Sequence, residues 1–262
     1  MNALKKEYNK LKKLHINLAR RDLLNFTTYT NAKYIPNWHH KYVANVLTEF
    51  ITTDKIKKLM IFMPPQHGKS ELASRNLPAF AFGINPDLKI AGVSYSIDLQ
   101  RLFNRDIQRI MISDEYKAIF PKVRLNEKGV LSSQNYLRNS DEFDIVGHRG
   151  SYKAVGVMGG LSGRPVDILL LDDTIKDALQ AYSAVYRERI WDWYLSVGDS
   201  RLHNDSKQII CMTRWHEDDL AGRLLDAEGD EWTVIKFLQY VKNRQNMTKE
   251  RSVKHFGKRG IR

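Results

Sequence analysis

Short apolar runs alternate with longer amphipathic stretches over most of the sequence from residue 58 onward. The runs at Leu59–Met63, Lys89–Ser94 and Val166–Leu171 have the length and the β-branched content of buried strands. Amphipathic segments of helical period lie between such runs, for example at Ile97–Ile112. Strands that alternate with helices of about 10–15 residues favour a mostly parallel sheet with helices on both faces. We therefore predict a three-layer α/β fold.

Weaker signals predict further elements of the same kind. Strand-like pieces occur at residues 143–146, 152–157, 208–212 and 232–237, and helical spacing occurs at residues 4–18, 38–51, 70–82, 181–195 and 217–225. From these signals we divide the chain into three parts. Residues 1–33 form a helical N-terminal extension, residues 34–237 a folded α/β domain, and residues 238–262 a basic tail.

The charge is distributed unevenly along the chain. The net charge is +12, but residues 1–21 carry +6 and residues 236–262 carry +8, which leaves −2 for residues 22–235. Basic flanks can bind the phosphate backbone of nucleic acids by releasing counterions. Solvated charged helices or tails explain the same composition equally well, so the charge permits DNA binding without deciding it.

Composition excludes several classes of protein. A hydrophobic fraction of 42% is too high for a disordered chain. The single cysteine, Cys211, excludes an internal disulfide framework. No apolar run approaches the ~18 residues that a membrane span needs, and the first residues lack the apolar core of a secretory signal. We expect a cytosolic protein without membrane contact.

A phosphate-binding loop follows the first predicted strand. Gly68-Lys69-Ser70 matches the second half of the G-x-x-x-x-G-K-[ST] pattern and opens a helix, with Gln66 and His67 inside the loop. Gly68 lets the backbone approach phosphate, Lys69 reaches the β- and γ-phosphates, and Ser70 offers a hydroxyl to Mg²⁺. The departure is Met63, where the pattern has its first glycine. A turn with a helix-capping serine is the alternative, but it needs no lysine.

Two adjacent carboxylates, Asp172 and Asp173, follow the apolar strand at Val166–Leu171. A nucleotide hydrolase needs one carboxylate for Mg²⁺ and one to orient the attacking water. We assign Asp172 to the metal and Asp173 to the water. Neighbouring strand residues normally point to opposite faces, but at a strand end both can line one crevice. We expect the loop around Lys69 and these carboxylates to meet from adjacent strand ends around a triphosphate and its magnesium.

Four blocks of sequence resemble one family, the ATPase half of the large terminase subunit of tailed bacteriophages and prophages. The blocks are Met60–Ser74 (MIFMPPQHGKSELAS), Ala91–Leu99 (AGVSYSIDL), Gly159–Asp173 (GGLSGRPVDILLLDD) and Thr213–Leu225 (TRWHEDDLAGRLL). The order and spacing of the blocks extend the resemblance over roughly residues 34–237. The combination is far more specific than the phosphate loop alone.

The resemblance implies a P-loop ATPase of the additional-strand type. It implies that ATP and Mg²⁺ are bound and that hydrolysis drives double-stranded DNA into an empty capsid. It also implies a homo-oligomeric ring on a portal protein, a small terminase subunit as partner, and work in the cytoplasm of a bacterial host. A family member would continue into a nuclease domain. These properties are expectations from the resemblance.

The resemblance also implies roles for single residues. Thr213, at a strand tip, would sense the γ-phosphate and pass its loss to a moving lobe. Arg164 would be an arginine finger acting across subunits, with Arg149 as the second candidate and a surface ion pair as the alternative for either. Trp38 lies where the family contacts adenine, although a buried core tryptophan is the more ordinary interpretation. Gln66 lies where many members have an arginine. Glutamine is uncharged, so it can substitute for the arginine only by hydrogen bonding.

Asp173 also departs from related motors, where the second carboxylate is usually a glutamate.

The tail after residue 237 departs more strongly from the family, and we hypothesise that it is translated from a shifted reading frame. A frame starting one nucleotide earlier turns residues 238–244 and 253–258 into segments typical of the family linker. The coding DNA tests this hypothesis, which requires a nuclease-like reading frame downstream, offset by one base. The competing hypothesis is that the tail is a basic arm that holds DNA.

Two other functions stay open at this point. A frameshifted prophage remnant would bind nucleotide without packaging DNA. An unrelated P-loop enzyme, such as a helicase or a nucleotide kinase, would share the first two motifs. A kinase should carry an arginine-rich lid, and TRWHEDDLAGRLL has no role in a helicase.

Overall fold

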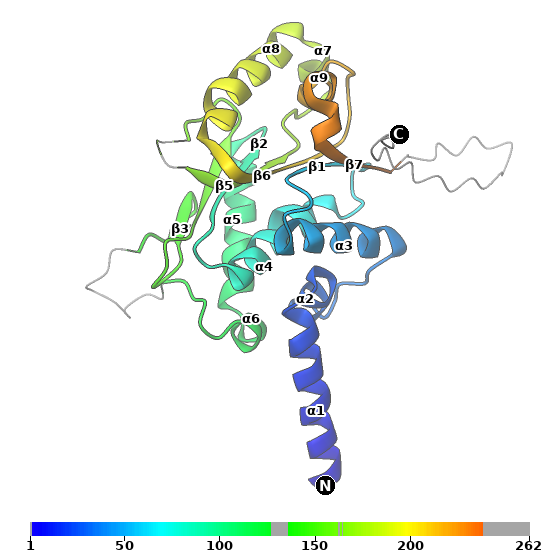
Figure 1. Ribbon diagram of the computed structural model, residues 1–262, viewed down its shortest axis with the longest axis vertical. Coiled ribbons are helices and arrows are strands. Elements are labelled where there is room, and N and C mark those ends of the chain that lie inside the picture. The colour runs from blue at the N-terminus through cyan, green and yellow to red at the C-terminus, as the bar shows by residue number, and fades with distance from the viewer. Residues whose placement is uncertain (1, 127–135, 162, 164, 238–262) are drawn as a thin grey trace, which may run out of the picture.

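The computed structural model describes residues 2–126, 136–161, 163 and 165–237. It contains one seven-stranded sheet with the strand order β3-β4-β2-β5-β6-β1-β7 and helices on both faces (Figure 1). All strand pairs are parallel except the edge pair β3–β4. The predicted three-layer, mostly parallel α/β fold is confirmed. No helix of the described residues has the length and apolarity to cross a membrane.

The strands agree with the predicted runs to within a few residues, except that β6 begins six residues earlier than expected. Their bounds are β1 Lys58–Phe62, β2 Lys89–Ser94, β3 Glu142–Asp144, β4 Ser151–Gly156, β5 Val166–Asp172, β6 Leu202–Met212 and β7 Trp232–Lys236. The first half of β6 reads LHNDSK and lacks the apolar pattern from which a strand is predicted.

The strand order corrects one expectation. The phosphate loop follows β1 and the two carboxylates end β5, but β1 and β5 are not neighbours. Strand β6 lies between them and pairs with both, for instance through Ile61↔Cys211 and Asp172↔Cys211. The two motifs therefore meet across the tip of β6, which places Thr213, the residue after β6, at the centre of this edge.

The sheet is buried on both faces because helices cover each of them. Along β1, Leu59 and Ile61 pack into one apolar core, whereas Met60 and Phe62 pack into the other. The first core is closed by α2 (Leu23–Thr30), α3 (Trp38–Thr52), η1 (Glu71–Asn76), α4 (Leu77–Ile84), α5 (Ile97–Ile112) and α6 (Asp114–Ile119). The second core is closed by α7 (Ala178–Tyr182), α8 (Ala184–Trp193), η2 (Tyr194–Gly198) and α9 (Leu220–Glu228). Two short 3-10 turns, η3 (Asp199–Arg201) and η4 (Gly229–Glu231), directly precede β6 and β7. Such two-sided burial explains why β1, β2 and β5 read as continuous apolar runs.

Helix α1 (Asn2–Ala19) projects from the body of the molecule (Figure 1). Its last residue, Ala19, is buried in the first core together with Leu23 and Phe26 of α2. The predicted helices before the α/β domain are present as α1 and α2, and α2 contributes to the core of that domain. The tail at residues 238–262, on which the shifted-frame hypothesis rests, lies outside the described residues.

Candidate nucleotide-binding site

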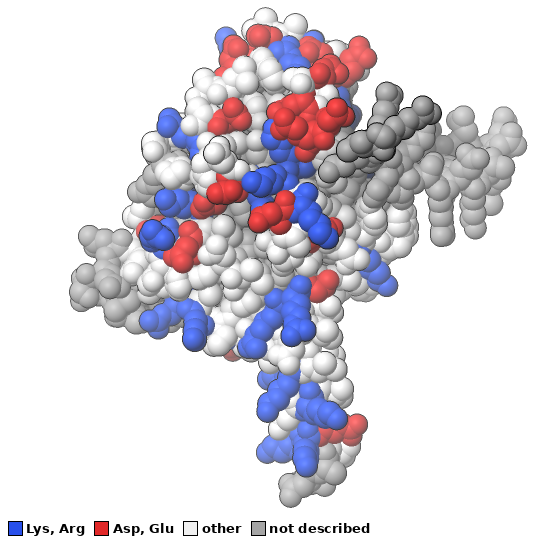
Figure 2. All heavy atoms as spheres, in the orientation of Figure 1, with Lys and Arg blue, Asp and Glu red and all other residues white. Residues whose placement is uncertain are grey.

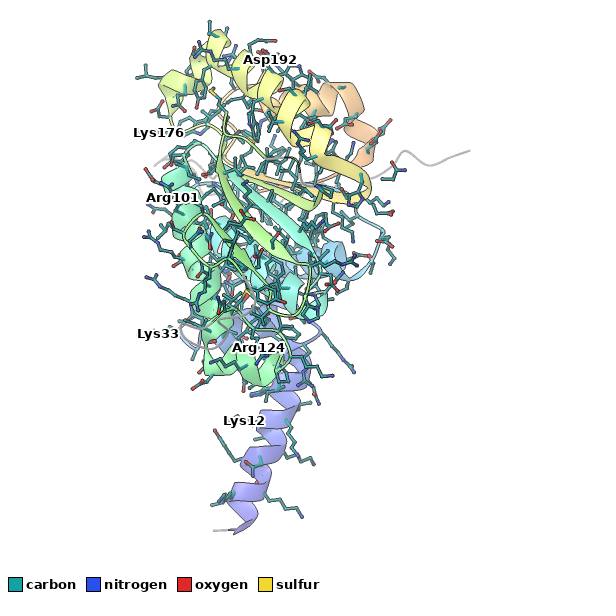
Figure 3. The ribbon with its side chains drawn as sticks, turned by 90° about the vertical axis from the view of Figure 1, so that its left-hand side faces the viewer. Lys12, Lys33, Arg101, Arg124, Lys176 and Asp192 are labelled. Atoms are coloured by element: carbon teal, nitrogen blue, oxygen red, sulfur yellow. The ribbon has the colours of Figure 1, made fainter. Side chains whose placement is uncertain are left out.

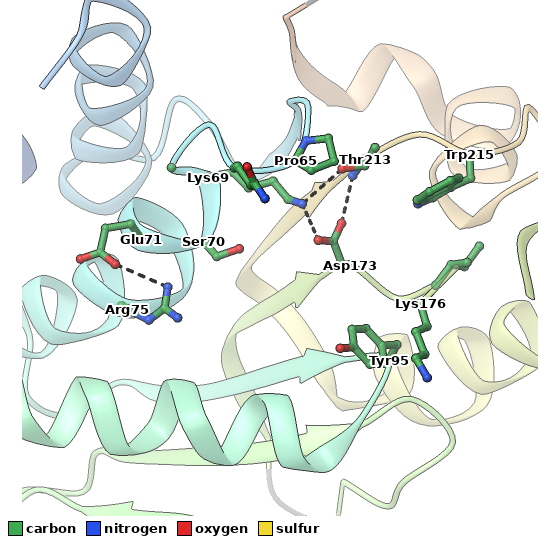
Figure 4. Close-up of a pocket in the computed structure, with 13 residues that line it drawn as sticks. Pro65, Lys69, Ser70, Glu71, Arg75, Tyr95, Asp173, Lys176, Thr213 and Trp215 are labelled. Atoms are coloured by element: carbon green, nitrogen blue, oxygen red, sulfur yellow. Dashed lines mark hydrogen bonds and ion pairs between the residues drawn. The ribbon is translucent and has the colours of Figure 1, made fainter. Parts of the chain in front are cut away.

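The carboxyl ends of β1, β2, β5 and β6 lie at one edge of the sheet because these strands run in parallel. A cavity of about 500 Å³ opens at this edge, which is where open α/β sheets bind ligands. Gly68, Lys69 and Ser70 line one side of it, and Asp173 and Thr213 line its centre (Figure 4). The strand ends therefore bring together the two motifs that the sequence singles out.

The phosphate loop has the backbone of an anion-binding turn. Gln66 and Gly68 have positive φ angles of 61° and 80°, so the loop passes twice through the left-handed region. A Cβ atom on Gly68 would lie 2.6 Å from Nε2 of His40, so only glycine fits here without a shift. Ser70 then opens η1, a π-helix, which is a form often found at functional sites.

Lys69, Asp173 and Thr213 form a connected group (Figure 4). The ammonium of Lys69 forms an ion pair with Oδ2 of Asp173 and lies 3.4 Å from Oγ1 of Thr213. The backbone N–H of Thr213 donates to Oδ1 of Asp173 at 3.0 Å, and its hydroxyl donates to the carbonyl of Met63 at 3.2 Å. Thr213 thus links the start of the phosphate loop to the carboxylate.

The two aspartates differ in environment because the chain turns between them. Asp172 pairs with Cys211 as the last residue of β5, whereas Asp173 has a φ of 42°, which breaks the strand alternation and points its side chain into the cavity. A positive φ is uncommon for a residue other than glycine, and aspartate is among the residues that tolerate it best. Both carboxylates therefore serve one site, with Asp173 in the cavity and Asp172 buried beside it.

Asp172 is only 1% exposed. Its Oδ2 accepts a hydrogen bond from the Ser74 hydroxyl, while its Oδ1 has no hydrogen-bond partner among the described residues. Burial raises the pKa of Asp172 to about 6, and the neighbouring charge of Asp173 adds to the effect. Lys69 and the hydroxyls of Ser74 and Ser70 act in the opposite direction and favour the carboxylate.

Other predicted residues lie outside the cavity. Trp38 begins α3, is 51% exposed and packs against Phe237, so the alternative of a buried core tryptophan is wrong. His67 is exposed, and its Nδ1–H donates to the carbonyl of Pro65 at 2.8 Å. Arg149 lies just before β4, at the amino-terminal edge of the sheet, opposite the cavity. Arg164 lies outside the described residues.

Two further residues support the site without a signal in the motifs. His40 accepts the N–H of Asn37 at Nδ1, and its Nε2–H donates to the carbonyl of His67 at 3.1 Å. Helix α3 is thereby attached to the phosphate loop. Ser74 lies one turn after Ser70 and holds Asp172. Neither role has a signal in the motifs, because each contact joins segments that are far apart in the chain.

This arrangement has the chemistry of a nucleotide site. It offers an ammonium, a helix start with free N–H groups, and two carboxylates, one buried and one in the cavity. The buried Oδ1 of Asp172, which has no partner in the part of the chain that the structure describes, and the nearby Ser70 hydroxyl are oxygen donors of the kind that Mg²⁺ prefers. The residues present therefore fit a magnesium ion. Beyond Asp173 the cavity continues to Tyr95, Lys176 and Trp215.

Comparisons with solved structures find distant likenesses. The HK97 bacteriophage large terminase is 12% identical with a TM-score of 0.46, and the match covers 74% of this chain and 36% of that one. The large terminase ATPase domain of Thermus phage P74-26 is 12% identical with a TM-score of 0.38, covering 69% of this chain and 70% of that one. A point variant of that domain is 13% identical with a TM-score of 0.40, and the match covers 68% of this chain and 65% of that one.

Comparison with protein families identifies the family of this chain. No match was found among curated proteins. The family described as terminase large subunit, T4-like virus type, N-terminal, matches residues 60–255 and so contains both motifs of the cavity and ends within the tail. Because this match covers more than half of the chain, the chain belongs to the large terminase subunit family and corresponds to the N-terminal, ATPase part of its T4-like type.

Proposed function

We propose that this chain hydrolyses ATP with Mg²⁺ and couples the reaction to the movement of double-stranded DNA into a procapsid. The observation that carries the proposal is the meeting of Lys69, Asp173 and Thr213 in the cavity. Each follows a different strand end. A lysine that binds phosphate and a residue that orients water are recurring parts of phosphoryl-transfer sites, and Thr213 connects the two here.

Binding of the triphosphate requires Lys69 to exchange partners. The ammonium of Lys69 is paired with Asp173, and the Lys69 side chain is only 7% exposed. We infer that the phosphates replace Asp173 as the partner of Lys69, while the N–H groups at the start of η1 bind phosphate oxygens. The exchange frees one carboxylate oxygen of Asp173, while Oδ1 stays on the N–H of Thr213. Asp173 is then placed to orient a water toward the γ-phosphate and to accept its proton.

Ser70 and Asp172 would hold the magnesium ion, Ser70 directly and Asp172 through Oδ1. Bound Mg²⁺ supplies neutralisation of the charge that develops on the phosphate oxygens. Ser74 fixes the other oxygen of Asp172, so that Oδ1 keeps its direction. Thr213 reports the loss of the γ-phosphate, because it contacts Lys69, Asp173 and the carbonyl of Met63.

The partners of the proposed reaction follow from the family. We propose double-stranded DNA as the moving substrate, a portal protein and a small terminase subunit as partners, and a ring of copies in the cytoplasm of a bacterial host. Within the ring, Arg164 is our first candidate for an arginine that completes a neighbour's site and Arg149 is the second. Gln66 and His67 in the loop would contact phosphates, and Trp38 the adenine.

DNA-stimulated ATPase activity tests this function. We expect phosphate release by the wild-type chain to require Mg²⁺ and to rise with added duplex DNA, and Lys69→Ala to abolish it. Lys58→Ala is the matched control, because Lys58 also forms ion pairs, with Glu228 and Glu231, but lies at the opposite end of β1. If wild type and Lys69→Ala both bind nucleotide and neither hydrolyses it, the chain is a prophage remnant.

A further inference from the structure

Helix α1 has an apolar stripe that nothing in the described structure covers. Leu4 is 74% exposed, Leu14 is 52% exposed, and Tyr8, Leu11 and Leu18 are exposed as well. Their spacings of three, four and seven residues place them on one face of the helix. Contiguous exposed apolar surface of this kind marks an interaction site. We call these five residues the leucine stripe.

Lysines surround the leucine stripe. Lys5 and Lys12 border it on one side and Lys10 on the other, while Lys6 and Lys13 occupy the back of the helix. Helix α1 carries five lysines and one glutamate. Two such helices laid stripe against stripe would bring like charges together, which is unfavourable. The partner of the stripe is therefore expected to be acidic.

The opposite end of the molecule is acidic. Residues 176–236 carry twelve Asp and Glu against eight Lys and Arg. Figure 2 shows acidic side chains gathered around α8 and α9, and basic side chains along the projecting α1. Lys12 and Asp192 mark these two ends in Figure 3. The exposed carboxylates of residues 176–236 are Glu188, Asp192, Asp199, Asp205, Glu217, Asp226, Asp230 and Glu231.

The acidic end also exposes apolar side chains. Leu179 and Tyr182 on α7 and Val185 on α8 are 86%, 70% and 65% exposed. Val185, Glu188 and Asp192 follow one another at three and four residues along α8 and share its outer face with Arg189. Glu188 also forms an ion pair with Arg223 of α9. This surface combines apolar groups with carboxylates, which complements the leucine stripe and its lysines.

We propose that the leucine stripe of one copy of this chain docks on the acidic end of a second copy, formed by α7, α8 and α9 together with the acidic segments beside them. The contact is heterologous, since two different surfaces meet, and it can repeat from copy to copy. Burial of the leucines supplies the affinity, and the lysine–carboxylate pairs select the partner surface. Lys176, which lines the cavity, lies two residues before α7, so the docked helix sits beside the nucleotide site of its neighbour.

Sedimentation velocity of the purified chain without nucleotide tests this proposal apart from the proposed ATPase function. We expect the wild type to associate in the micromolar range, and to dissociate as salt screens the charges. Leu11→Ser with Leu14→Ser should weaken association about tenfold for each leucine. Both residues are exposed in the single chain, so the fold should survive. Ile35→Ser, an exposed apolar residue off the stripe, is the control and should change nothing.

Charge exchange identifies the second surface. Variant one carries Lys5→Glu and Lys12→Glu, and variant two carries Asp192→Lys and Asp226→Lys. Each alone places like charges in the contact and should stay monomeric, whereas an equimolar mixture restores opposite charges and should associate. A monomeric wild type, association that is indifferent to the leucine substitutions, or a mixture that stays monomeric would each overturn the proposal. The first result would leave a different acidic protein as the partner of α1.

Discussion

The ammonium of Lys69 is paired with the carboxylate of Asp173, 104 residues further along the chain, across the tip of the strand that separates β1 from β5. In the proposed mechanism the triphosphate binds to this same lysine, so it must displace Asp173 from Lys69. Nucleotide binding and the release of Asp173 are therefore one event in our account. Under this proposal, Asp173 becomes free to orient water only when phosphates bind Lys69.

Asp173→Asn should separate binding from hydrolysis. The amide pairs more weakly with Lys69, so affinity for ATP should be retained or should rise. Hydrolysis should fall at least about 100-fold, because the proton acceptor is lost. Phosphate release and titration with a fluorescent ATP analogue measure the two effects. Asp167→Asn, on the same strand but at its other end, is the control. Wild-type hydrolysis by Asp173→Asn would show that Asp173 does not orient the water.

Ser74→Ala should lower the affinity for magnesium. It removes the hydrogen bond to Oδ2 of Asp172 and leaves that buried oxygen unpaired, at a cost of about 1–3 kcal/mol in the free energy of unfolding. The freed carboxylate should lose its direction toward the metal, so more Mg²⁺ should be needed for half-maximal ATP binding. Ser206→Ala is the control, because it also loses a buried hydrogen bond, to Val166, far from the site. Equal magnesium requirements in both variants would restrict Ser74 to a structural role.

Gly68→Ala should weaken nucleotide binding. The left-handed backbone at Gly68 costs a residue with a Cβ about 1–2 kcal/mol, and the new atom would lie 2.6 Å from Nε2 of His40. The loop must shift, and affinity for ATP should fall about tenfold or more. Gly160→Ala, where an added Cβ meets nothing within 4 Å, should bind ATP as the wild type does. Unchanged affinity in Gly68→Ala would argue against phosphate binding by this loop.

The contact between α3 and the phosphate loop should weaken in mild acid. Burial lowers the pKa of His40 from 6.5; the hydrogen bond to the His67 carbonyl raises it, and the His67 charge lowers it further. Below pH 6.5 the unfolded chain therefore binds a proton more readily than the folded chain, and the free energy of unfolding falls as the pH falls. Protonation also removes the acceptor at Nδ1 that binds the N–H of Asn37.

His40→Gln isolates this effect. The wild-type Tm should fall between about pH 7 and about pH 5.5, and in His40→Gln that fall should be smaller. His15→Gln, in the projecting helix α1, is the control and should follow the wild type. Parallel curves for wild type and His40→Gln would mean that other groups carry the pH dependence.

Local signals in the sequence predict much of the fold. Helix α5 has the predicted bounds Ile97–Ile112, since its apolar spacing is regular and Ser96 caps it. Strand β2 likewise agrees, because its buried centre at residues 90–93 lacks polar side chains and lies between Lys89 and Ser94. The predicted helix at residues 181–195 is instead divided at Ser183, whose side chain caps α8. The first half of β6 was missed because its polar residues lie at the exposed end of the sheet.

The site is predictable only where its chemistry is local. Gly68-Lys69-Ser70 and Asp172-Asp173 are visible as motifs because adjacent residues carry the chemistry. The insertion of β6 between their strands, the bond from His40 to the phosphate loop and the contact of Ser74 with Asp172 depend on pairings between distant segments. Periodicity and composition carry no information about such pairings.

A structure of the chain with a non-hydrolysable ATP analogue and Mg²⁺ tests the central claim most directly. The account predicts that the pair between Lys69 and Asp173 is broken, that the Lys69 ammonium contacts the β- and γ-phosphates, and that the metal lies about 2.1 Å from the Ser70 hydroxyl oxygen. An analogue bound elsewhere, with Lys69 still paired to Asp173, would contradict it.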